Sequence, residues 1–307
     1  MRIAILNHVN ALNLGDASLI YATLDLLAES VNPHKISILS FNPRYDIEDL
    51  ELPQNVEILP SPAREAPSIS EKIRVIADMA LFFSWSISSR FGVDILHYSS
   101  GYRKAVAEAL KEADLVLIRG GDTLTDIYGV KSIILNLSNI LLPLLLRKRT
   151  LTLGNTIGPF NTKIWKIVIS CFLRKLDYIV VRDEYSRKLL VEMGVGSSKV
   201  RFLPDVAFAL PFKQLELPSL VRLVPSQLCI GVIPSALALK FLSRKPKGGD
   251  YAGYMEVFSK VIDYVIDKYS ATVLLIPHVL YWRTDDRKIA RDIYENVSNK
   301  DKVCLLY

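Results

Sequence analysis

The sequence predicts an α/β protein with open, mostly parallel sheets, divided into two domains. The chain has 307 residues, a length that suits two domains of about 150 residues each. Half of the residues are apolar and 23% are charged, which excludes a disordered tail, a collagen-like repeat and a coiled coil. Short apolar runs alternate with helical patterns along the chain, as they do in parallel sheets that helices cover on both faces.

The first series of elements fills residues 1–210 and predicts the larger domain. Strands are expected at residues 2–9, 35–42, 56–60, 114–119, 150–153, 178–181 and 200–203. Helices, with apolar residues at helical spacing, are expected at 17–31, 70–91, 103–113, 131–148, 163–176 and 184–193. Because a helix lies between most successive strands, we expect right-handed crossovers, and crossovers of this kind build one parallel sheet.

A second, shorter series follows a proline-containing break. Residues 211–227 carry Pro211, Pro218 and Pro225 with little periodicity, and we expect them to connect the domains. Residues 228–307 then show strands at 228–233, 271–276 and 302–306, helices at 251–269 and 285–297, and a basic loop at 244–250. About 80 residues with three strands form only a small sheet, so we expect an incomplete second domain.

Composition also bears on location. Cys171, Cys229 and Cys304 lie far apart in apolar runs, so we expect reduced thiols in the core of an intracellular, cytoplasmic protein. The most apolar stretch has about 14 residues, short of the roughly 18 needed to span a bilayer. The N-terminus runs straight into a strand pattern, so no signal peptide is expected.

The charge balance favours anionic partners. Lys and Arg outnumber Asp and Glu by 38 to 32, which gives a net charge of +6. This charge and the cluster Arg147, Lys148 and Arg149 predict a peripheral contact with the inner membrane face; the alternative is a solvated helix end, where cations are also favourable. No basic stripe alternates with aromatic residues, so we expect no nucleic-acid partner.

Candidate site residues follow the predicted strands, because ligands of open α/β sheets bind beyond the carboxyl ends of the strands. The loop after the first strand contains Asn13, Gly15 and Asp16. We expect Asp16 to cap the next helix and Gly15 to permit a close ligand approach, while Asn side chains suit sugar hydroxyls or a phosphate. The alternative is a capped helix start without a ligand.

Glycines follow two further strands. Gly120 and Gly121, with Asp122 next, would let backbone amides approach a ligand. Asn155 lies in a third loop, predicted at residues 154–160. None of these loops is a dinucleotide fingerprint, because no Gly-x-Gly-x-x-Gly follows a strand, and the Walker pattern is absent too.

The remaining candidates carry charge or a hydroxyl group. Arg182 stands at a strand end and suits a bidentate contact with a carboxylate or phosphate; the alternative is an ion pair with a neighbouring carboxylate. Ser186 opens the following helix, Asp205 follows the next strand, and His278 follows a strand of the second domain. No cluster of His, Cys and carboxylates has metal-ligand spacing, so no metal is expected.

The order of six short motifs resembles the polysaccharide pyruvyl transferase family over essentially the whole chain. The motifs are Asn13-x-Gly15-Asp16, Gly120-Gly121 with Asp126, Gly154-x-x-Ile157-Gly158-Pro159, Val181-Arg182-Asp183-Glu184-x-Ser186, Pro204-Asp205-x-Ala207-Phe208 and Ile276-Pro277-His278. The resemblance implies two Rossmann-like domains resembling GT-B glycosyltransferases. It also implies transfer of a pyruvyl group from phosphoenolpyruvate to a sugar, usually as a ketal on a cell-surface glycan.

This resemblance gives the candidates provisional roles. Arg182 would contact the anionic donor, and Asp16, Asp205 and His278 would share the acid and base roles, which the sequence does not divide among them. The other substrate-binding residues would be Asn13, Gly15, Gly120, Gly121, Asp122, Asn155 and Ser186. Phosphoenolpyruvate would be a substrate and no cofactor is implied. The expected partners are a glycan or lipid-linked sugar acceptor in the cleft between the domains, and a second copy of the chain in a homo-oligomer.

Two departures from the family pattern define the alternatives. Family members commonly have a third glycine at the position of Asp122, and they continue past Tyr307 into an Arg-x-His segment of the donor site. We therefore expect a chain truncated at its C-terminus, or one completed by a neighbouring polypeptide, with little activity alone. The alternatives are a GT-B glycosyltransferase that uses a nucleotide sugar and an inactive glycan-binding remnant.

Overall fold

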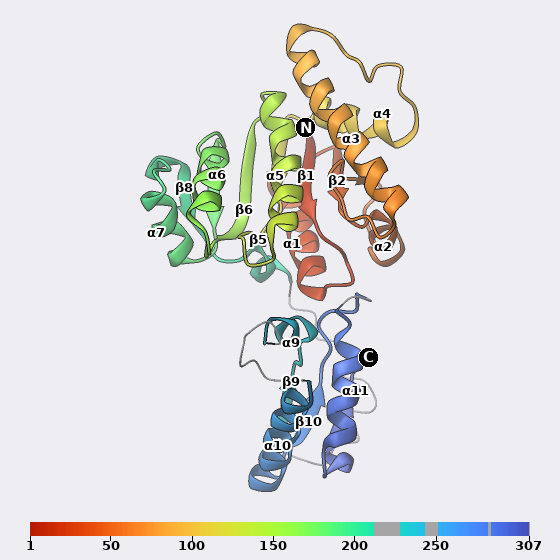
Figure 1. Ribbon diagram of the computed structural model, residues 1–307, viewed down its shortest axis with the longest axis vertical. Coiled ribbons are helices and arrows are strands. Elements are labelled where there is room, and N and C mark those ends of the chain that lie inside the picture. The colour runs from red at the N-terminus through yellow and green to blue at the C-terminus, as the bar shows by residue number, and fades with distance from the viewer. Residues whose placement is uncertain (212–227, 243–250, 282–283, 307) are drawn as a thin grey trace. The chain divides into compact units, whose positions relative to one another are not determined.

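The computed structural model describes residues 1–211, 228–242, 251–281 and 284–306 (Figure 1). The chain divides into two compact units. The first contains Met1–Ala11 and Asp16–Pro211, and the second contains Leu12–Gly15 and Phe212–Tyr307. The sequence did not predict that Leu12–Gly15 belongs to the second unit. Residues 212–227 of the predicted connection, and the predicted basic loop at 244–250, lie outside the described residues.

The first unit is built on one parallel sheet of eight strands. The strands are β1 (Arg2–His8), β2 (Lys35–Ser40), β3 (Val56–Pro60), β4 (Leu115–Ile118), β5 (Gly121–Leu124), β6 (Thr150–Ile157), β7 (Tyr178–Val181) and β8 (Val200–Phe202). Their order is β3-β2-β1-β4-β6-β7-β8, and β5 also pairs with β6. The predicted parallel sheet is therefore confirmed.

Helices cover both faces of this sheet. They are α1 (Leu14–Ser30), α2 (Pro43–Asp49), α3 (Ile69–Ser88), α4 (Gly101–Glu112), α5 (Val130–Leu145), α6 (Lys163–Leu173) and α7 (Glu184–Glu192). Ile3 and Ile5 of β1 pack with Ile20 of α1, whereas Ala4 and Leu6 pack in a second cluster with residues of α3, α4 and α5. Successive residues of one strand thus serve opposite faces, as the pleat requires.

Two strands differ from the sequence prediction in a way that moves candidate residues. β6 continues to Ile157 instead of ending near residue 153, so Asn155 lies within a strand and not in a loop. β5 was expected to be part of a loop, and it pairs with this extension through Gly121 and Asn155. The pattern concealed both segments because glycine and asparagine are rare in strands.

The second unit contains a parallel sheet of three described strands in the order β11-β10-β9. The strands are β9 (Cys229–Val232), β10 (Thr272–Leu275) and β11 (Val303–Leu305), and the helices are α9 (Ala236–Leu242), α10 (Tyr251–Tyr269) and α11 (Asp286–Asn296). Ile262, Val273 and Ile293 lie in the core that joins the sheet to α10 and α11. α9 was not predicted, whereas α10 has the predicted bounds.

The cysteines do not lie where the sequence predicted. Cys171 and Cys229 are exposed and Cys304 is half-buried, and all three are free thiols. The expectation of buried core cysteines is wrong, because Cys171 lies on the outward side of α6 and Cys229 on an outer strand of the small sheet. Among the described helices, none combines the length and apolarity needed to cross a bilayer.

Candidate functional site

Five predicted site residues of the first unit lie at the same edge of its sheet. Asp16 follows β1, Asp122 lies in β5, Asn155 is near the end of β6, Arg182 follows β7 and Asp205 follows β8. Because the strands are parallel, their carboxyl ends share one edge, where ligands of this fold class bind. We call this set of residues the carboxyl-edge site.

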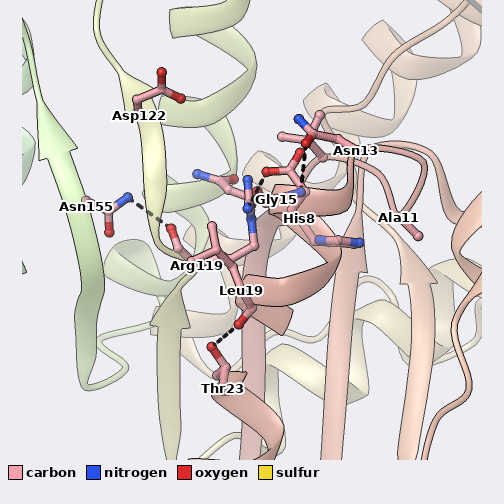
Figure 2. A network of polar contacts seen from close by, with 12 residues as sticks. His8, Ala11, Asn13, Gly15, Leu19, Thr23, Arg119, Asp122 and Asn155 are labelled. Carbon is pink, nitrogen blue, oxygen red and sulfur yellow. Dashed lines mark hydrogen bonds and ion pairs between the residues drawn. The ribbon is translucent and has the colours of Figure 1, made fainter. Parts of the chain in front are cut away.

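A buried arginine organises the centre of this edge (Figure 2). Arg119 is 2% exposed, and its Nη1 donates to Asp16 Oδ1 at 2.6 Å. Its Nε donates to the backbone oxygen of Asn7 at 3.2 Å, and Asn155 Nδ2 donates to the backbone oxygen of Arg119 at 2.9 Å. The Asp16 carboxylate is thereby fixed in place. The sequence analysis missed Arg119, although a charged residue at the end of an apolar strand was a usable signal.

The predicted helix cap at Asp16 is wrong. α1 begins at Leu14, so Asp16 lies within its first turn, and Asn13 precedes the helix. Asn13 Oδ1 accepts a hydrogen bond from Gly15 N at 3.1 Å. Asn13 therefore has the capping role, and the Asp16 carboxylate is left for Arg119.

Arg182 is held by two neighbours and keeps one side of its guanidinium unbonded. Its Nε donates to Thr156 Oγ1 at 2.9 Å, and its Nη1 donates to Asp205 Oδ2 at 2.5 Å. The side chain of Arg182 is 27% exposed, and Nη2 makes no hydrogen bond with a described residue. Asp205 also accepts from Ala207 N at 2.9 Å, which fixes the carboxylate that orients the arginine.

Ser186, a predicted substrate-binding residue, lies in a buried position in the first turn of α7. It is fully buried, its hydroxyl donates to Asp183 Oδ2 at 2.8 Å, and that hydroxyl accepts from Ile157 N at 2.8 Å. Asp183 caps α7 by accepting from Ser186 N. Ser186 thus joins the end of β6 to the start of α7, and its expected role in substrate binding stays a prediction.

The structure explains why residues 120 and 121 are glycines. A Cβ added to Gly120 would lie 2.4 Å from the backbone oxygen of Leu153, so only glycine lets the chain pass β6 at this point. Gly121 has a φ of 115°, which side chains rarely adopt. Both residues are buried. The expected approach of their backbone amides to a ligand stays a prediction.

Tyr128 joins the carboxyl-edge site through Asp122, a contact that no sequence pattern indicated. Its hydroxyl donates to Asp122 Oδ2, and both residues are exposed. Partial burial and the Asp122 hydrogen bond raise the pKa of Tyr128, Asp16 raises it further, and Arg182 lowers it. The phenol is therefore neutral at ordinary pH, and it lies within electrostatic reach of Asp16 and Arg182.

A buried pair of ionisable side chains lies close to the loop after β1. His8 and Asp46 are fully buried, and His8 Nε2 lies 3.2 Å from Asp46 Oδ1. Asp46 also accepts from Ala11 N at 2.6 Å and from the Ser40 hydroxyl. The sequence analysis missed this pair, which ties the loop at Ala11 to α2.

His278 lies with Asn13 and Gly15 in the second unit. Leu14 N donates to the His278 backbone oxygen at 3.1 Å, and Asn13 forms an antiparallel bridge with Val279. A Cβ on Gly15 would lie 3.0 Å from His278 Nε2, so glycine leaves space for the exposed imidazole. The structure thus brings together three predicted residues that are far apart in the sequence.

A buried carboxylate that the sequence analysis missed positions this histidine. Asp286 is 1% exposed and accepts from Val279 N at 2.8 Å, from Ala236 N at 2.8 Å and from His278 N at 3.3 Å. Three backbone N–H groups, two in the loop after β10 and one at the start of α9, therefore donate to one side chain at the start of α11.

The carboxyl-edge site provides the groups that acid–base group transfer from an anionic donor needs. Arg182 supplies positive charge, the carboxylates of Asp16, Asp122 and Asp205 can accept protons or hydrogen bonds, and the Tyr128 phenol can donate. Within the described ranges, no group of three or more His, Cys, Asp and Glu side chains is placed to hold a metal ion.

Comparison with solved structures identifies the class of fold. The chain is similar to a putative UDP-N-acetylglucosamine 2-epimerase from Listeria monocytogenes, with a TM-score of 0.58 and 9% identity over 99% of this chain and 68% of that one. It is also similar to S. aureus MnaA in complex with UDP, with a TM-score of 0.54 and 10% identity over 100% and 69% of the two chains. At such low identity the likeness shows the fold alone, which is Rossmann-like and resembles GT-B.

The chain belongs to the polysaccharide pyruvyl transferase family, which matches residues 13–306. It is 26% identical over 206 residues to the amylovoran biosynthesis protein AmsJ of Erwinia amylovora. That match covers 66% of this chain and 48% of AmsJ, so this chain spans about half the length of its curated relative.

Proposed function

We propose that the protein transfers the pyruvyl group of phosphoenolpyruvate to a sugar of a cell-surface glycan. The observation that carries this proposal is the placement of Arg182. Its guanidinium stands at the carboxyl end of β7, is oriented by Thr156 and Asp205, and keeps Nη2 unbonded to any described residue. A planar cation held in this way suits the carboxylate or the phosphate of the donor.

The reaction requires three proton transfers. The methylene carbon of phosphoenolpyruvate gains a proton, and the adjacent carbon is attacked by a sugar hydroxyl that loses its own proton. The carbon–oxygen bond to the phosphate then breaks, a second hydroxyl of the sugar closes the ketal, and the departing inorganic phosphate takes up the proton of that second hydroxyl. One acid and one base close to Arg182 therefore serve the reaction.

The carboxylate that best fits the role of base is Asp16. Arg119 fixes it at 2.6 Å, and a fixed carboxylate can accept the proton of an attacking hydroxyl without first reorienting. Asp205 is less suited, because both of its carboxylate oxygens already accept hydrogen bonds, Oδ2 from Arg182 and Oδ1 from Ala207 N. Within the first unit, Tyr128 is the candidate for the acid, and the acid or base role expected of His278, which belongs to the second unit, stays a prediction.

The proposal is tested with the complete 307-residue chain, phosphoenolpyruvate and a panel of sugar acceptors. We expect release of inorganic phosphate that depends on the acceptor, with a pyruvate ketal on the product by mass spectrometry. In a thermal unfolding experiment, we expect phosphoenolpyruvate to raise the Tm of the protein and UDP to leave it unchanged. Stabilisation by UDP alone would instead support a nucleotide-sugar glycosyltransferase, and stabilisation by glycan alone would support a binding protein.

A further inference from the structure

The outward face of α3 is unusually apolar. The helix packs against the core through Val75, Phe82 and Trp85, which are at most 6% exposed. Its opposite face carries four isoleucines, Ile69, Ile73, Ile76 and Ile87, which are 76%, 64%, 67% and 49% exposed. The core of the first unit explains the apolar side chains on the packed side of α3, but not the isoleucines on its exposed side. We call the four exposed isoleucines, together with Phe91, the α3 surface.

The residues of the α3 surface form one continuous stripe. Their spacings of four, three and eleven residues return to the same side of a helix, and Ala80, which is exposed, lies between Ile76 and Ile87. A 3-10 turn at Ser89–Phe91 continues the helix and ends at Phe91, which is 81% exposed. The stripe therefore runs the full length of α3, which lies on the outside of the first unit (Figure 1).

The charges near the α3 surface are predominantly positive. Lys72 and Arg90 are exposed and form no ion pair with another described residue, and Arg74 is exposed and interacts electrostatically with Glu71. The acids of the same segment have partners. Glu71 hydrogen-bonds to Ser68 in the capping box of α3, and Asp94 pairs with Lys111 at 2.6 Å. A partner that covers this face therefore meets apolar side chains flanked by the cations Lys72 and Arg90, which have no ion pair within the described residues.

We propose that the α3 surface binds the surface of a membrane that contains anionic lipids. An apolar stripe flanked by Lys and Arg is the pattern of a helix that lies in the interface, with its apolar side chains among the acyl chains and its cations at the headgroups. A second copy of the chain fits less well, because a two-fold contact would bring the same cations together.

The sequence analysis assigned this role to Arg147, Lys148 and Arg149, and the structure favours another place. Lys148 Nζ donates to the backbone oxygens of Lys111 and Ala113, at 2.5 and 3.1 Å. Its ammonium group is therefore already hydrogen-bonded within the protein and is less available to a lipid headgroup. The α3 surface combines free cations with apolar area, which the cluster lacks. This inference does not depend on the proposed reaction, because it rests on residues outside the carboxyl-edge site.

The test is co-sedimentation of the complete chain with vesicles of phosphatidylglycerol and phosphatidylcholine, or of phosphatidylcholine alone. We expect binding to the anionic vesicles that weakens as the salt concentration rises. The double variant Ile73→Asp and Ile76→Asp should lower the partition coefficient at least about tenfold, because two carboxylates replace the apolar contacts. Circular dichroism checks that the variant is folded.

α6 provides a matched control. Ile164 and Ile167 have the same spacing as Ile73 and Ile76 and are 69% and 62% exposed. The double variant Ile164→Asp and Ile167→Asp carries the same change of charge and should bind within about twofold of the unchanged protein. Equal loss in both variants, or no binding of the unchanged protein to anionic vesicles, would overturn the proposal. A dimer that only the α3 variant dissociates, with vesicle binding unchanged, would assign the surface to a second copy.

Discussion

Arg119 and Asp16 are 103 positions apart in the sequence and form an ion pair of 2.6 Å at the carboxyl edge of the sheet. The side chain of Arg119 is 1% exposed and that of Asp16 is 14% exposed. Little water reaches either charge, so each is stabilised mainly by the other. Arg119 also donates a hydrogen bond to the backbone oxygen of Asn7, close to the end of β1. One contact therefore connects the first strand, the first helix and the end of β4.

Replacing Arg119 should destabilise the first unit. Arg119→Met leaves the Asp16 carboxylate without its cation, and breaking a buried pair in this way costs about 3 to 5 kcal/mol. Urea unfolding followed by circular dichroism measures the change. The double variant Arg119→Met and Asp16→Asn should regain part of the loss, because no unpaired charge remains. An Arg119→Met protein that unfolds at the original urea concentration would show that the pair contributes little.

Replacing Arg182 should weaken donor binding. Arg182→Ala removes a charge-assisted contact, which corresponds to about 1.5 to 3 kcal/mol, or roughly a 10- to 150-fold higher Kd for phosphoenolpyruvate. Isothermal titration calorimetry measures this value. Arg201→Ala is the matched control, because Arg201 is exposed in the neighbouring strand β8 and its side chain donates only to backbone oxygens of Ser198 and Val200. Equal affinities for the two variants would remove Arg182 from the donor site.

Alanine at position 120 should disturb the sheet more than alanine elsewhere. Its Cβ would lie 2.4 Å from the backbone oxygen of Leu153, so β4 and β6 must separate locally, at about 1 to 3 kcal/mol. Gly196→Ala is the control, because a Cβ there meets nothing closer than Ser198 Oγ at 3.9 Å. Thermal unfolding should show a lower Tm for Gly120→Ala alone. Equal Tm values would mean that the strands adjust without cost.

Acid should destabilise the packing of α3 on α4 through Asp78. Burial raises the pKa of this carboxyl, but hydrogen bonds from Tyr102, Arg103 and Arg64 outweigh burial and lower it overall. A folded-state pKa below the unfolded value contributes stability above about pH 4, and that stability is lost as the pH falls through the folded-state pKa.

Asp78→Asn should therefore be less stable than the unchanged protein at neutral pH and should lose less stability on acidification. Unfolding free energies measured between pH 7 and pH 3 test the sign of this difference. Parallel pH profiles for the two proteins would contradict it, because they would show that Asp78 titrates alike in the folded and unfolded states.

The sequence predicts the parallel sheet well because its strands are continuous apolar runs. Arg182 and Asp205 were placed at strand ends by their position alone, and they lie there. Asn155 and Asp122 were misplaced in loops, because β5 and the end of β6 are polar and contain glycine, and they are strands through pairing with each other and, for Asn155, with Val181 of β7. Local propensity cannot reveal a strand that depends on its partner.

The polar partners of the site were harder to predict. Arg119 with Asp16, and His8 with Asp46, are pairs that only the fold brings together, and neither residue of a pair indicates the other in the sequence. Ser186 was predicted from its motif, but a hydroxyl at the start of a helix serves equally well as a buried link between backbone segments.

The positions of the cysteines make the protein suitable for spectroscopic labelling. Cys229 and Cys304 lie on the strands on either side of β10 and pair with Thr272 and Leu274, so they are about 12 Å apart, which is too far for a disulfide between them. Burial and the neighbouring Cys229 raise the pKa of the Cys304 thiol, which disfavours its thiolate form, and Cys304 is only half-exposed. A maleimide dye would therefore react first with Cys171 and Cys229, one in each unit. Energy transfer between two such dyes would report the distance between the units in solution, with and without substrates, and no cysteine would have to be introduced.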